Sequence, residues 1–319
     1  MNIPLKKKLF ERAFEHSEGV LITFKGVDGW DVYNCSTPFL WKGKRHIYGR
    51  VERRDEWASS HVSPFVETGK DEFTALPGFT WKLEDPFIQK INGEFILGGT
   101  HVVKKGKTVV SYCDYFFRGP SPTQLRFFAS GPMNMKDIRL VQLASGKVGV
   151  FSRPREAHHA NIGFVVLDHI DELNEESVKR ATPLDLFDKG AWGGVNQAYL
   201  LFSGKVGCVA HYSYRTTDQN NNPLSVYVNF SFVLDPQTYA VSDTKIIGAR
   251  KCYPPCSAKK DYLIDCVFTS GIVMRPDGRC DLYSGVADTH EGRLVIDYPF
   301  RDHGNIVNDL CSVQSHSSL

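Results

Sequence analysis

Five similar hairpin turns punctuate the chain and constrain its fold more than any other feature. Each turn interrupts two apolar, strand-like runs, and the turns are Gly43-Lys44, Asn92-Gly93, Gly146-Lys147, Gly204-Lys205 and Asp277-Gly278. Counted from the first turn residue, the spacings are 49, 54, 58 and 73 residues. A repeat of this size is typical of the blades of a β-propeller, in which each repeat is one small antiparallel sheet.

The second strand of each hairpin has a shared position seven residues after the turn glycine. The residues there are Arg50, Thr100, Arg153, His211 and Gly285. Equivalent strands of a radial repeat present the same position toward the same axis. We therefore predict that Arg50, Arg153 and His211 converge near one mouth of a central channel and make it electropositive.

Strand signals dominate the chain, and helical periodicity is nearly absent. The 319 residues divide into five repeats of about 64, which suits four strands with loops. The predicted fold is all-β, a five-bladed β-propeller in a single domain over residues 1–319. We expect blades near 30–80, 81–130, 135–188, 190–250 and 260–300, an early strand at 19–27 that closes the ring, and a loosely held tail from about residue 303.

Composition limits the possible partners. The formal net charge is only +2, which favours neither a nucleic-acid nor a membrane partner. The basic start lacks the apolar region of a secretory signal, and no run reaches the roughly 18–20 apolar residues that span a bilayer. We expect a cytoplasmic protein; its oligomeric state stays open.

Cysteine usage gives the same expectation. The eight cysteines lie mostly in strand-like runs, as reduced, buried thiols do. Cys252 and Cys256 lack a second pair at zinc-site spacing, and His158-His159 on an extended chain would face opposite ways. We expect neither a metal nor an organic cofactor.

Polar residues precede the strands that would line the channel, where propellers usually bind ligands. The candidates for substrate contact are Asp31, Asn34, Arg50, Glu84, Asp265 and Asp288, with Asp85 beside them. Trp192, which is followed by two glycines, is the best candidate for a platform that stacks on a sugar ring. Carboxylates near arginine and histidine indicate a hydroxyl-rich or anionic substrate.

Several segments resemble the five-bladed propeller enzymes of glycoside hydrolase family 130, the mannoside phosphorylases. LEDPFIQKINGEFILGGTHV resembles their Glu-Asp-Pro strand, and DCVFTSGIVMRPDGRCDLYSGVADTHEGRL resembles their closing blade. Weaker matches in NCSTPFLWKGKRHIYGRVE, VGVFSRPR, VGCVAHYSY and VYVNFSFVLDPQTYAV follow the same order. Overall the chain is more similar to an uncharacterised propeller family related to those enzymes.

The resemblance implies a carbohydrate-active enzyme that cleaves a mannoside-like oligosaccharide with inversion, using inorganic phosphate as co-substrate. It makes Asp85 the general acid, acting through a substrate hydroxyl, and Asp288 a sugar ligand. It assigns phosphate to Arg153 and His211, and the neighbouring Arg155 is a further candidate. Two family arginines are replaced here, by Phe87 and Asn229.

Two other functions stay open. An inverting hydrolase on the same scaffold would need a carboxylate base, roughly 6.5–9.5 Å from the acid, for which Asp31, Glu52 or Asp265 could serve. A non-catalytic carbohydrate-binding propeller would keep Trp192 and Asp288 useful. Because neighbours in a strand point to opposite faces, we expect Glu84 not to crowd Asp85.

Overall fold

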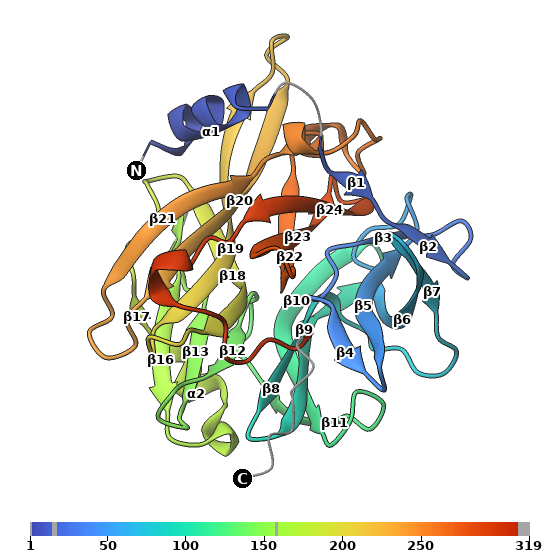
Figure 1. The fold of residues 1–319 in the computed structure, drawn as a ribbon. Helices are drawn as coiled ribbons and strands as arrows, with labels where there is room; N and C mark the ends of the chain where they lie inside the picture. The colour runs from blue at the N-terminus through green and yellow to red at the C-terminus, as the bar shows by residue number, and fades with distance from the viewer. Residues whose placement is uncertain (1, 15–17, 157–158, 312–319) are drawn as a thin grey trace.

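Each of the five sequence repeats forms its own sheet, antiparallel except where β2 joins the first one, and the sheets stand around one central axis (Figure 1). The computed structural model describes residues 2–14, 18–156 and 159–311. The five-bladed, all-β prediction is confirmed, and each of the five predicted turns joins two consecutive antiparallel strands of one blade.

The blades have these strands. Blade 1 contains β2 (Thr23–Lys25), β3 (Asp31–Tyr33), β4 (Phe39–Trp41), β5 (Lys44–Glu52), β6 (His61–Gly69) and β7 (Glu72–Ala75). Blade 2 contains β8 (Glu84–Ile91), β9 (Glu94–Lys105), β10 (Thr108–Gly119) and β11 (Arg126–Ser130). Blade 3 contains β12 (Arg139–Gln142), β13 (Val148–Ser152), β16 (Gly163–Leu167) and β17 (Thr182–Pro183). Blade 4 contains β18 (Trp192–Leu200), β19 (Val206–Thr217), β20 (Pro223–Leu234) and β21 (Val241–Gly248). Blade 5 contains β1 (Val20–Leu21), β22 (Val267–Met274), β23 (Arg279–Val286) and β24 (His290–Asp297).

A few short elements decorate the ring. The helix α1 (Ile3–Arg12) precedes the first strand. A two-stranded ribbon follows β13, and the remaining helical segments lie between strands except η4, which follows β24. These elements are β14 (Arg155–Glu156), β15 (His159–Ala160), η1 (Ile170–Glu172), α2 (Glu175–Lys179), η2 (Arg250–Cys252), η3 (Asp261–Leu263) and η4 (Arg301–His303).

The glycine of each repeated turn has the same backbone conformation. Gly43, Gly93, Gly146, Gly204 and Gly278 have φ values of 75°, 83°, 82°, 80° and 80°. This left-handed region is open to glycine at little cost and is unfavourable for most other residues. The repeated glycines therefore fix the hairpin register that places the later strand positions.

The run 19–27 is divided between the last and the first blades. Its first part, β1, pairs antiparallel with β24, with Val20 opposite Arg293. Its second part, β2, runs parallel to β7. The early chain thus covers edge strands of both blades, and unpaired edges invite aggregation. Since the blades share one ring, we propose that the chain folds as a single domain.

The end of the chain differs from its prediction. The prediction of a loose tail from residue 303 is wrong for residues up to 311, because backbone hydrogen bonds attach this segment to blades 1 and 4. Ile306 bridges Leu201, and the amide of Leu40 donates to the carbonyl of Leu310 at 2.8 Å. The rest of the predicted tail, 312–319, lies outside the described residues.

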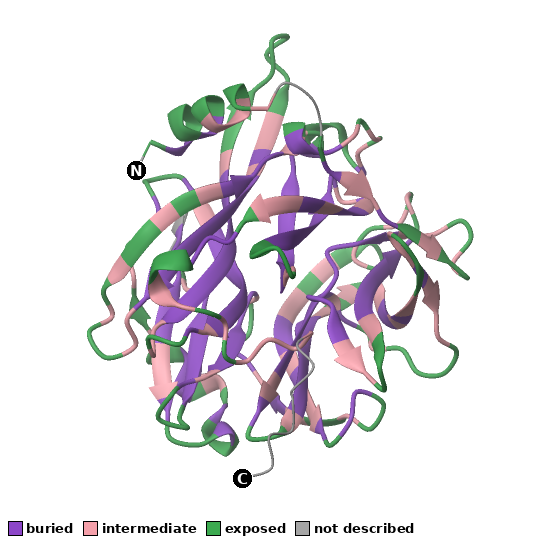
Figure 2. Cartoon of the chain, in the orientation of Figure 1, coloured by how far each residue is buried: buried purple, intermediate pink, exposed green. Residues whose placement is uncertain are grey.

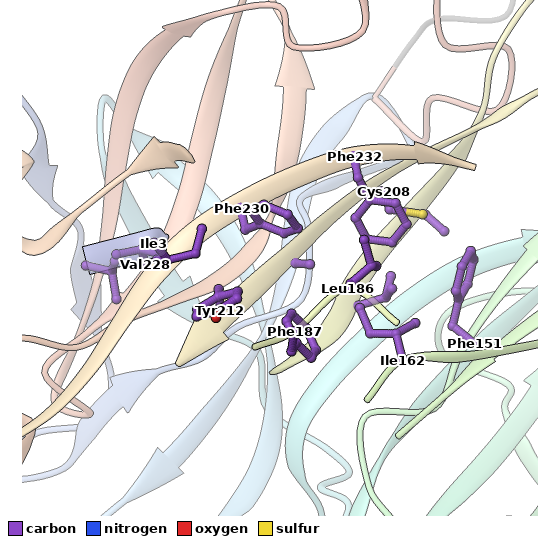
Figure 3. Packing of buried hydrophobic residues seen from close by; sticks show 14 of the residues in the cluster. Ile3, Phe151, Ile162, Leu186, Phe187, Cys208, Tyr212, Val228, Phe230 and Phe232 are labelled. Carbon is purple, nitrogen blue, oxygen red and sulfur yellow. The ribbon is translucent and has the colours of Figure 1, made fainter. Parts of the chain in front are cut away.

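Buried residues fill the inner and middle strands of the blades (Figure 2). The largest apolar cluster joins blades 3, 4 and 5; Phe230 and Phe232 of β20 and Phe151 of β13 belong to it (Figure 3). Burying such a side chain stabilises the fold by roughly 1.5–3 kcal/mol. All eight cysteines are free, and Cys208 lies inside this cluster. Among the described residues, no helix is long and apolar enough to cross a membrane.

Candidate active site

Three polar residues with a left-handed backbone stand where the inner strands of blades 1, 2 and 3 begin or break. Asn34 follows β3 with a φ of 46°, Asp85 is the second residue of β8 with a φ of 49°, and Asp137 precedes β12 with a φ of 62°. Asparagine and aspartate tolerate this conformation better than other non-glycine residues. The inner strands contact one another around the axis, so these residues gather at one mouth.

Asp85 is the most heavily coordinated of the three. Its Oδ1 accepts from Arg50 Nη1 at 2.9 Å and from Asn34 Nδ2 at 3.0 Å, and its Oδ2 accepts from Lys136 Nζ at 3.3 Å. Only 2% of the residue is exposed. Burial alone would raise the pKa of Asp85, but Lys136 and Arg50 outweigh burial and hold it well below its usual range. Asp85 is therefore ionised in this state.

Glu84 also faces Arg50, contrary to the expectation from strand alternation. The pairing register of β8 with β9 shifts between Glu84 and Phe87, and together with the φ of Asp85 this bulge turns both carboxylates toward one guanidinium. Glu84 Oε1 lies 3.1 Å from Arg50 Nη2. Burial first, and then the charge of Asp85, raise the pKa of Glu84, although Arg50 opposes them.

Arg139 holds the backbone at this bulge. Its Nη2 donates to the carbonyl of Asp85 at 3.2 Å, and its guanidinium lies 4.9 Å from the centre of the Phe87 ring. Phe87, which replaces an arginine of the resembled family, is thus a buried support for Arg139. Asn229, the other replacement, donates to Thr269 Oγ1 at 2.9 Å between blades 4 and 5.

Asp137 organises a second group of charges. It forms a short ion pair with Arg153 Nη1, and its Oδ2 lies 3.7 Å from His211 Nε2. Burial would raise the pKa of Asp137, but Arg153 and then Lys136 lower it below its ordinary value. Arg153 and His211, predicted from their shared strand position, therefore meet at one carboxylate.

Lys136 connects the two groups. It stands next to Asp137 in the chain and reaches Asp85 with its ammonium group. Burial would lower the pKa of Lys136, but Asp85 and Asp137 raise it. Because 27% of its side chain remains exposed, Lys136 presents a cation at the mouth between Arg50 on one side and Arg153 on the other.

His211 is neutral and has one unused ring nitrogen. Its Nδ1 lies 2.9 Å from Asn196 Oδ1, an oxygen that accepts from the Nδ1–H tautomer of the ring. Burial lowers the pKa of His211 to about 3, although Asp137 opposes this. Nε2 is buried without a hydrogen-bond partner, so in this tautomer it can accept a hydrogen bond from a group that enters the site.

Two further predicted residues lie at the edge of these groups. Asp288, with a φ of 53°, accepts from Asn34 Nδ2 at 3.4 Å, and burial raises its pKa. Trp192 Nε1 lies 3.3 Å from Tyr227 Oη, and the Tyr227 ring stacks on His211 at 5.8 Å. Both side chains could contact a ligand that spans the mouth.

The remaining predicted residues are engaged elsewhere. Asp31 forms two bonds with Arg54, at 2.5 and 2.7 Å. Asp265 binds Lys7 of α1 at 2.9 Å, and the exposed Arg155 donates to Tyr112 Oη at 2.9 Å. Among the residues that the structure describes, no hydrogen bond or ion pair joins these three to either charged group.

Sequence reasoning missed Lys136 and Asp137, although a usable signal was present. Asn34, Asp85 and Asp137 are separated by 51 and 52 residues (85 − 34 and 137 − 85), close to the spacing of the hairpin turns. The shared register of the second strands predicts Arg50, Arg153 and His211, and the same register in the first strands places Asp137 beside Asp85, with Lys136 preceding it.

The arrangement suits acid–base and anion chemistry. Within the described ranges, no group of three or more histidine, cysteine, aspartate or glutamate side chains is placed to hold a metal ion. The carboxylates of Asp85 and Asp137 instead alternate with three cations, Arg50, Lys136 and Arg153.

Comparison with known proteins identifies similar chains. A family model described as a protein of unknown function, DUF1861, matches residues 8–302. No curated protein matches the chain. The structure of MPT-4, a mannose phosphorylase from Leishmania mexicana in complex with phosphate ion, is 60% identical, with 97% of each chain covered and a TM-score of 0.94.

Two other structures extend this comparison. MPT-1, a GDP-Man-dependent mannosyltransferase from Leishmania mexicana, is 50% identical over 98% of this chain and 100% of its own, with a TM-score of 0.92. A structure from the GH130 family of mannoside phosphorylases is 14% identical over 93% of this chain and 98% of its own, with a TM-score of 0.56. The latter shows a shared fold only.

Proposed function

The chain belongs to the DUF1861 family, and from this premise we propose that it is a phosphorylase that cleaves mannooligosaccharides with inorganic phosphate and inversion. The observation that carries the proposal is the row of cations through Lys136, which joins the Asp85 carboxylate to the Arg153–His211 group. The mannose phosphorylase that is 60% identical and contains phosphate supports the same reaction.

Arg153 and Lys136 would hold the phosphate. Charge-assisted bonds from arginine to phosphate are strong and directional, and lysine adds a point charge. His211 Nε2, a buried acceptor without a partner, fits a phosphate that retains one proton. A phosphate oxygen would then attack the anomeric carbon on the face opposite the leaving oxygen.

Asp85 would supply the proton to the leaving oxygen, through a substrate hydroxyl as the family resemblance implies. A C–O bond forms between phosphate and the anomeric carbon, and the glycosidic C–O bond breaks. The relaying hydroxyl gives its own proton to the leaving oxygen of the released sugar and takes the proton of Asp85 in its place. Asp85 is ionised in the ligand-free protein, so it must gain a proton during binding. A phosphate dianion beside Lys136 would offset the cation that holds the pKa of Asp85 down.

The ion pairs disfavour hydrolysis. A hydrolase needs a carboxylate that is free to activate water, and all three residues considered for that role are paired with cations. Asp31 binds Arg54, Asp265 binds Lys7, and Glu52 forms a buried ion pair with Lys259. The similarity to a mannosyltransferase leaves one alternative. In that alternative the protein transfers mannose to a saccharide, and GDP-mannose is the donor in place of mannose 1-phosphate.

Incubation of the protein with mannotriose, with and without phosphate, tests the proposal. We expect phosphate-dependent release of mannose 1-phosphate, and Asp85→Asn should lower its rate by about 10²–10⁴-fold. Asp85→Asn should still bind phosphate, because it removes a negative charge beside Lys136, whereas Arg153→Ala should lose that binding. Release of free mannose without phosphate, or turnover of GDP-mannose alone, would contradict the proposal.

The unpaired cysteines bear on the location. All eight are free, which is expected in a reducing compartment. We infer a cytoplasmic location from this, and a tagged full-length chain followed by cell fractionation would test it.

A further inference from the structure

A polar pocket of about 440 Å³ opens beside the charged site, between blades 1 and 2. We call it the Glu84 pocket. The loop 53–60, the segment before β8 and the second half of β9 form its walls. Its volume lies within the range of about 300–1,000 Å³ that is usual for small-molecule sites.

Hydroxyl groups form part of the polar lining of this pocket. Ser59, Ser60 and Thr80 supply them, whereas the buried Thr100 donates its hydroxyl proton to Asp114 Oδ1 at 2.7 Å. His61, Lys82 and Glu84 complete the polar lining, while Leu83 and Val102 supply apolar surface. Alternating donors, acceptors and small apolar faces match the hydroxyl and C–H faces of a sugar ring.

The pocket is held in shape by a cross-link over its edge. Lys104 Nζ, from β9, donates to the carbonyl of Trp57 at 2.6 Å and to Ser59 Oγ at 2.7 Å. These bonds attach the loop 53–60 to the neighbouring blade. A site that is formed before binding needs less ordering of the protein when the ligand arrives.

One guanidinium joins this pocket to the proposed acid. Arg50 Nη1 binds Asp85 Oδ1 at 2.9 Å, and Arg50 Nη2 lies 3.1 Å from Glu84 Oε1 in the pocket wall. Lys136 approaches the other oxygen of Asp85. Asp85 therefore lies between the Lys136–Arg153 cations and the Glu84 pocket.

The charges of the two sides differ. The side of Lys136 and Arg153 brings two cations to the mouth and suits an anion. In the Glu84 pocket, Glu84 is paired with Arg50, and serine and threonine hydroxyls lie beside Lys82, a mixed polar lining that suits the hydroxyl groups of a sugar. An inverting displacement places nucleophile and leaving group on opposite sides of the reacting carbon. The Glu84 pocket, on the other side of Asp85 from the two cations, is thus suited to the part of the substrate that leaves.

We propose that the Glu84 pocket binds the leaving saccharide of the mannooligosaccharide, the portion that departs with the glycosidic oxygen. The identification of this saccharide as the leaving one rests on the proposed function. The choice of a saccharide as the ligand rests on the lining, whose serine and threonine hydroxyls can pair with the hydroxyl groups of a sugar.

Filling the pocket tests this assignment. Ser60→Trp places an indole in the pocket, and Thr80→Trp does the same from an exposed position, so at least one variant should keep the native fold. Ser203→Trp, at the exposed turn between β18 and β19, is the matched control. Titration calorimetry then measures the binding of mannotriose and of inorganic phosphate to each full-length protein.

We expect the pocket-filling variants to weaken mannotriose binding by about tenfold or more, equivalent to 1.4 kcal/mol, with phosphate binding unchanged and the Ser203→Trp control like the wild type. Unchanged mannotriose affinity in folded pocket-filling variants would overturn the assignment, as would a wild type that binds no mannotriose. If the variants lose mannotriose while the wild type forms no mannose 1-phosphate, the pocket assignment stands and the phosphorylase proposal fails.

Discussion

Lys136 should control the protonation of Asp85, and Lys136→Met tests this coupling. Their charged atoms lie 3.3 Å apart, so Coulomb's law at an effective dielectric constant of about 20 gives an upper bound of about 5 kcal/mol. At 1.36 kcal/mol per pKa unit this corresponds to about 3 to 4 units. Cations at such distances usually lower a carboxyl pKa by about 1–3 units, and we expect Lys136→Met to raise the pKa of Asp85 by that amount.

Carbon-13 NMR of protein labelled at the aspartate carboxyl carbons measures this shift directly. The Asp85 signal is assigned as the one missing from Asp85→Asn, and it is titrated between about pH 2 and pH 8. Lys147→Met, which removes an exposed lysine paired with Asp168, is the control and should leave the Asp85 titration unchanged. An Asp85 pKa that stays constant or falls in Lys136→Met would refute the coupling.

Three further predictions concern buried groups around the ring. Glu291 is fully buried, and burial raises its pKa to about 7; its contribution to stability is present below the unfolded-state pKa near 4.5 and is lost as pH rises through 7. Glu291→Gln should therefore remove about 3 kcal/mol of pH dependence between pH 4.5 and 7 in urea unfolding. Gly285→Ala would place its Cβ 1.9 Å from Asn34 Oδ1, so we expect a loss of turnover by about tenfold or more in a folded protein, because Asn34 must move away from Asp85. Lys259→Met leaves Glu52 buried with Arg50, Tyr33 and the backbone amide of Ser59 as its remaining partners. It should lower the free energy of unfolding by about 3 kcal/mol, and the double variant with Glu52→Gln should recover part of that loss.

Each of these predictions has a control and a contrary outcome. Glu176→Gln changes an exposed carboxyl and should leave the pH dependence of stability intact; an identical curve for Glu291→Gln would count against the buried titration. Gly69→Ala adds a methyl group at ordinary contact distance, and equal activity of Gly285→Ala and Gly69→Ala would show that Asn34 need not be fixed. No recovery in the Lys259→Met/Glu52→Gln protein would mean that the buried charge of Glu52 is not the source of the loss.

The five-bladed ring could be predicted from the sequence because the conformation of a turn depends mainly on the residues of the turn itself. The five turn glycines signal their own backbone conformation, and this signal needs no tertiary information. The same register predicted that Arg153 and His211 would be neighbours. It did not predict that Glu84 and Asp85 share Arg50, because strand alternation assumes a regular ladder, and β8 begins with a bulge that depends on Arg139 from another blade.

Charge partners were predictable only in part. Asp31 begins the inner strand β3 and Asp265 precedes β22, but their partners Arg54 and Lys7 come from a loop and from the N-terminal helix. Nothing in the local sequence specifies such partners, because they are set by how separate segments pack. The same applies to Glu52, whose partner Lys259 is 207 residues away in the chain.

The left-handed residues at the mouth connect the fold to the proposed chemistry. A strand that continued regularly through Asp85 would point this carboxylate and that of Glu84 to opposite faces, and Arg50 could bind only one of them. The positive φ costs of order 1–3 kcal/mol at such a residue, and hydrogen bonds from Arg139 to the backbone and from Asn34 and Arg50 to the carboxylate offset it. Binding of phosphate beside Lys136 would then add negative charge next to a carboxylate that cannot move away. Because the added negative charge destabilises the ionised carboxylate, Asp85 would take up a proton. The rigidity of the bulge would thus couple phosphate binding to protonation of Asp85, the form that can donate to the leaving oxygen.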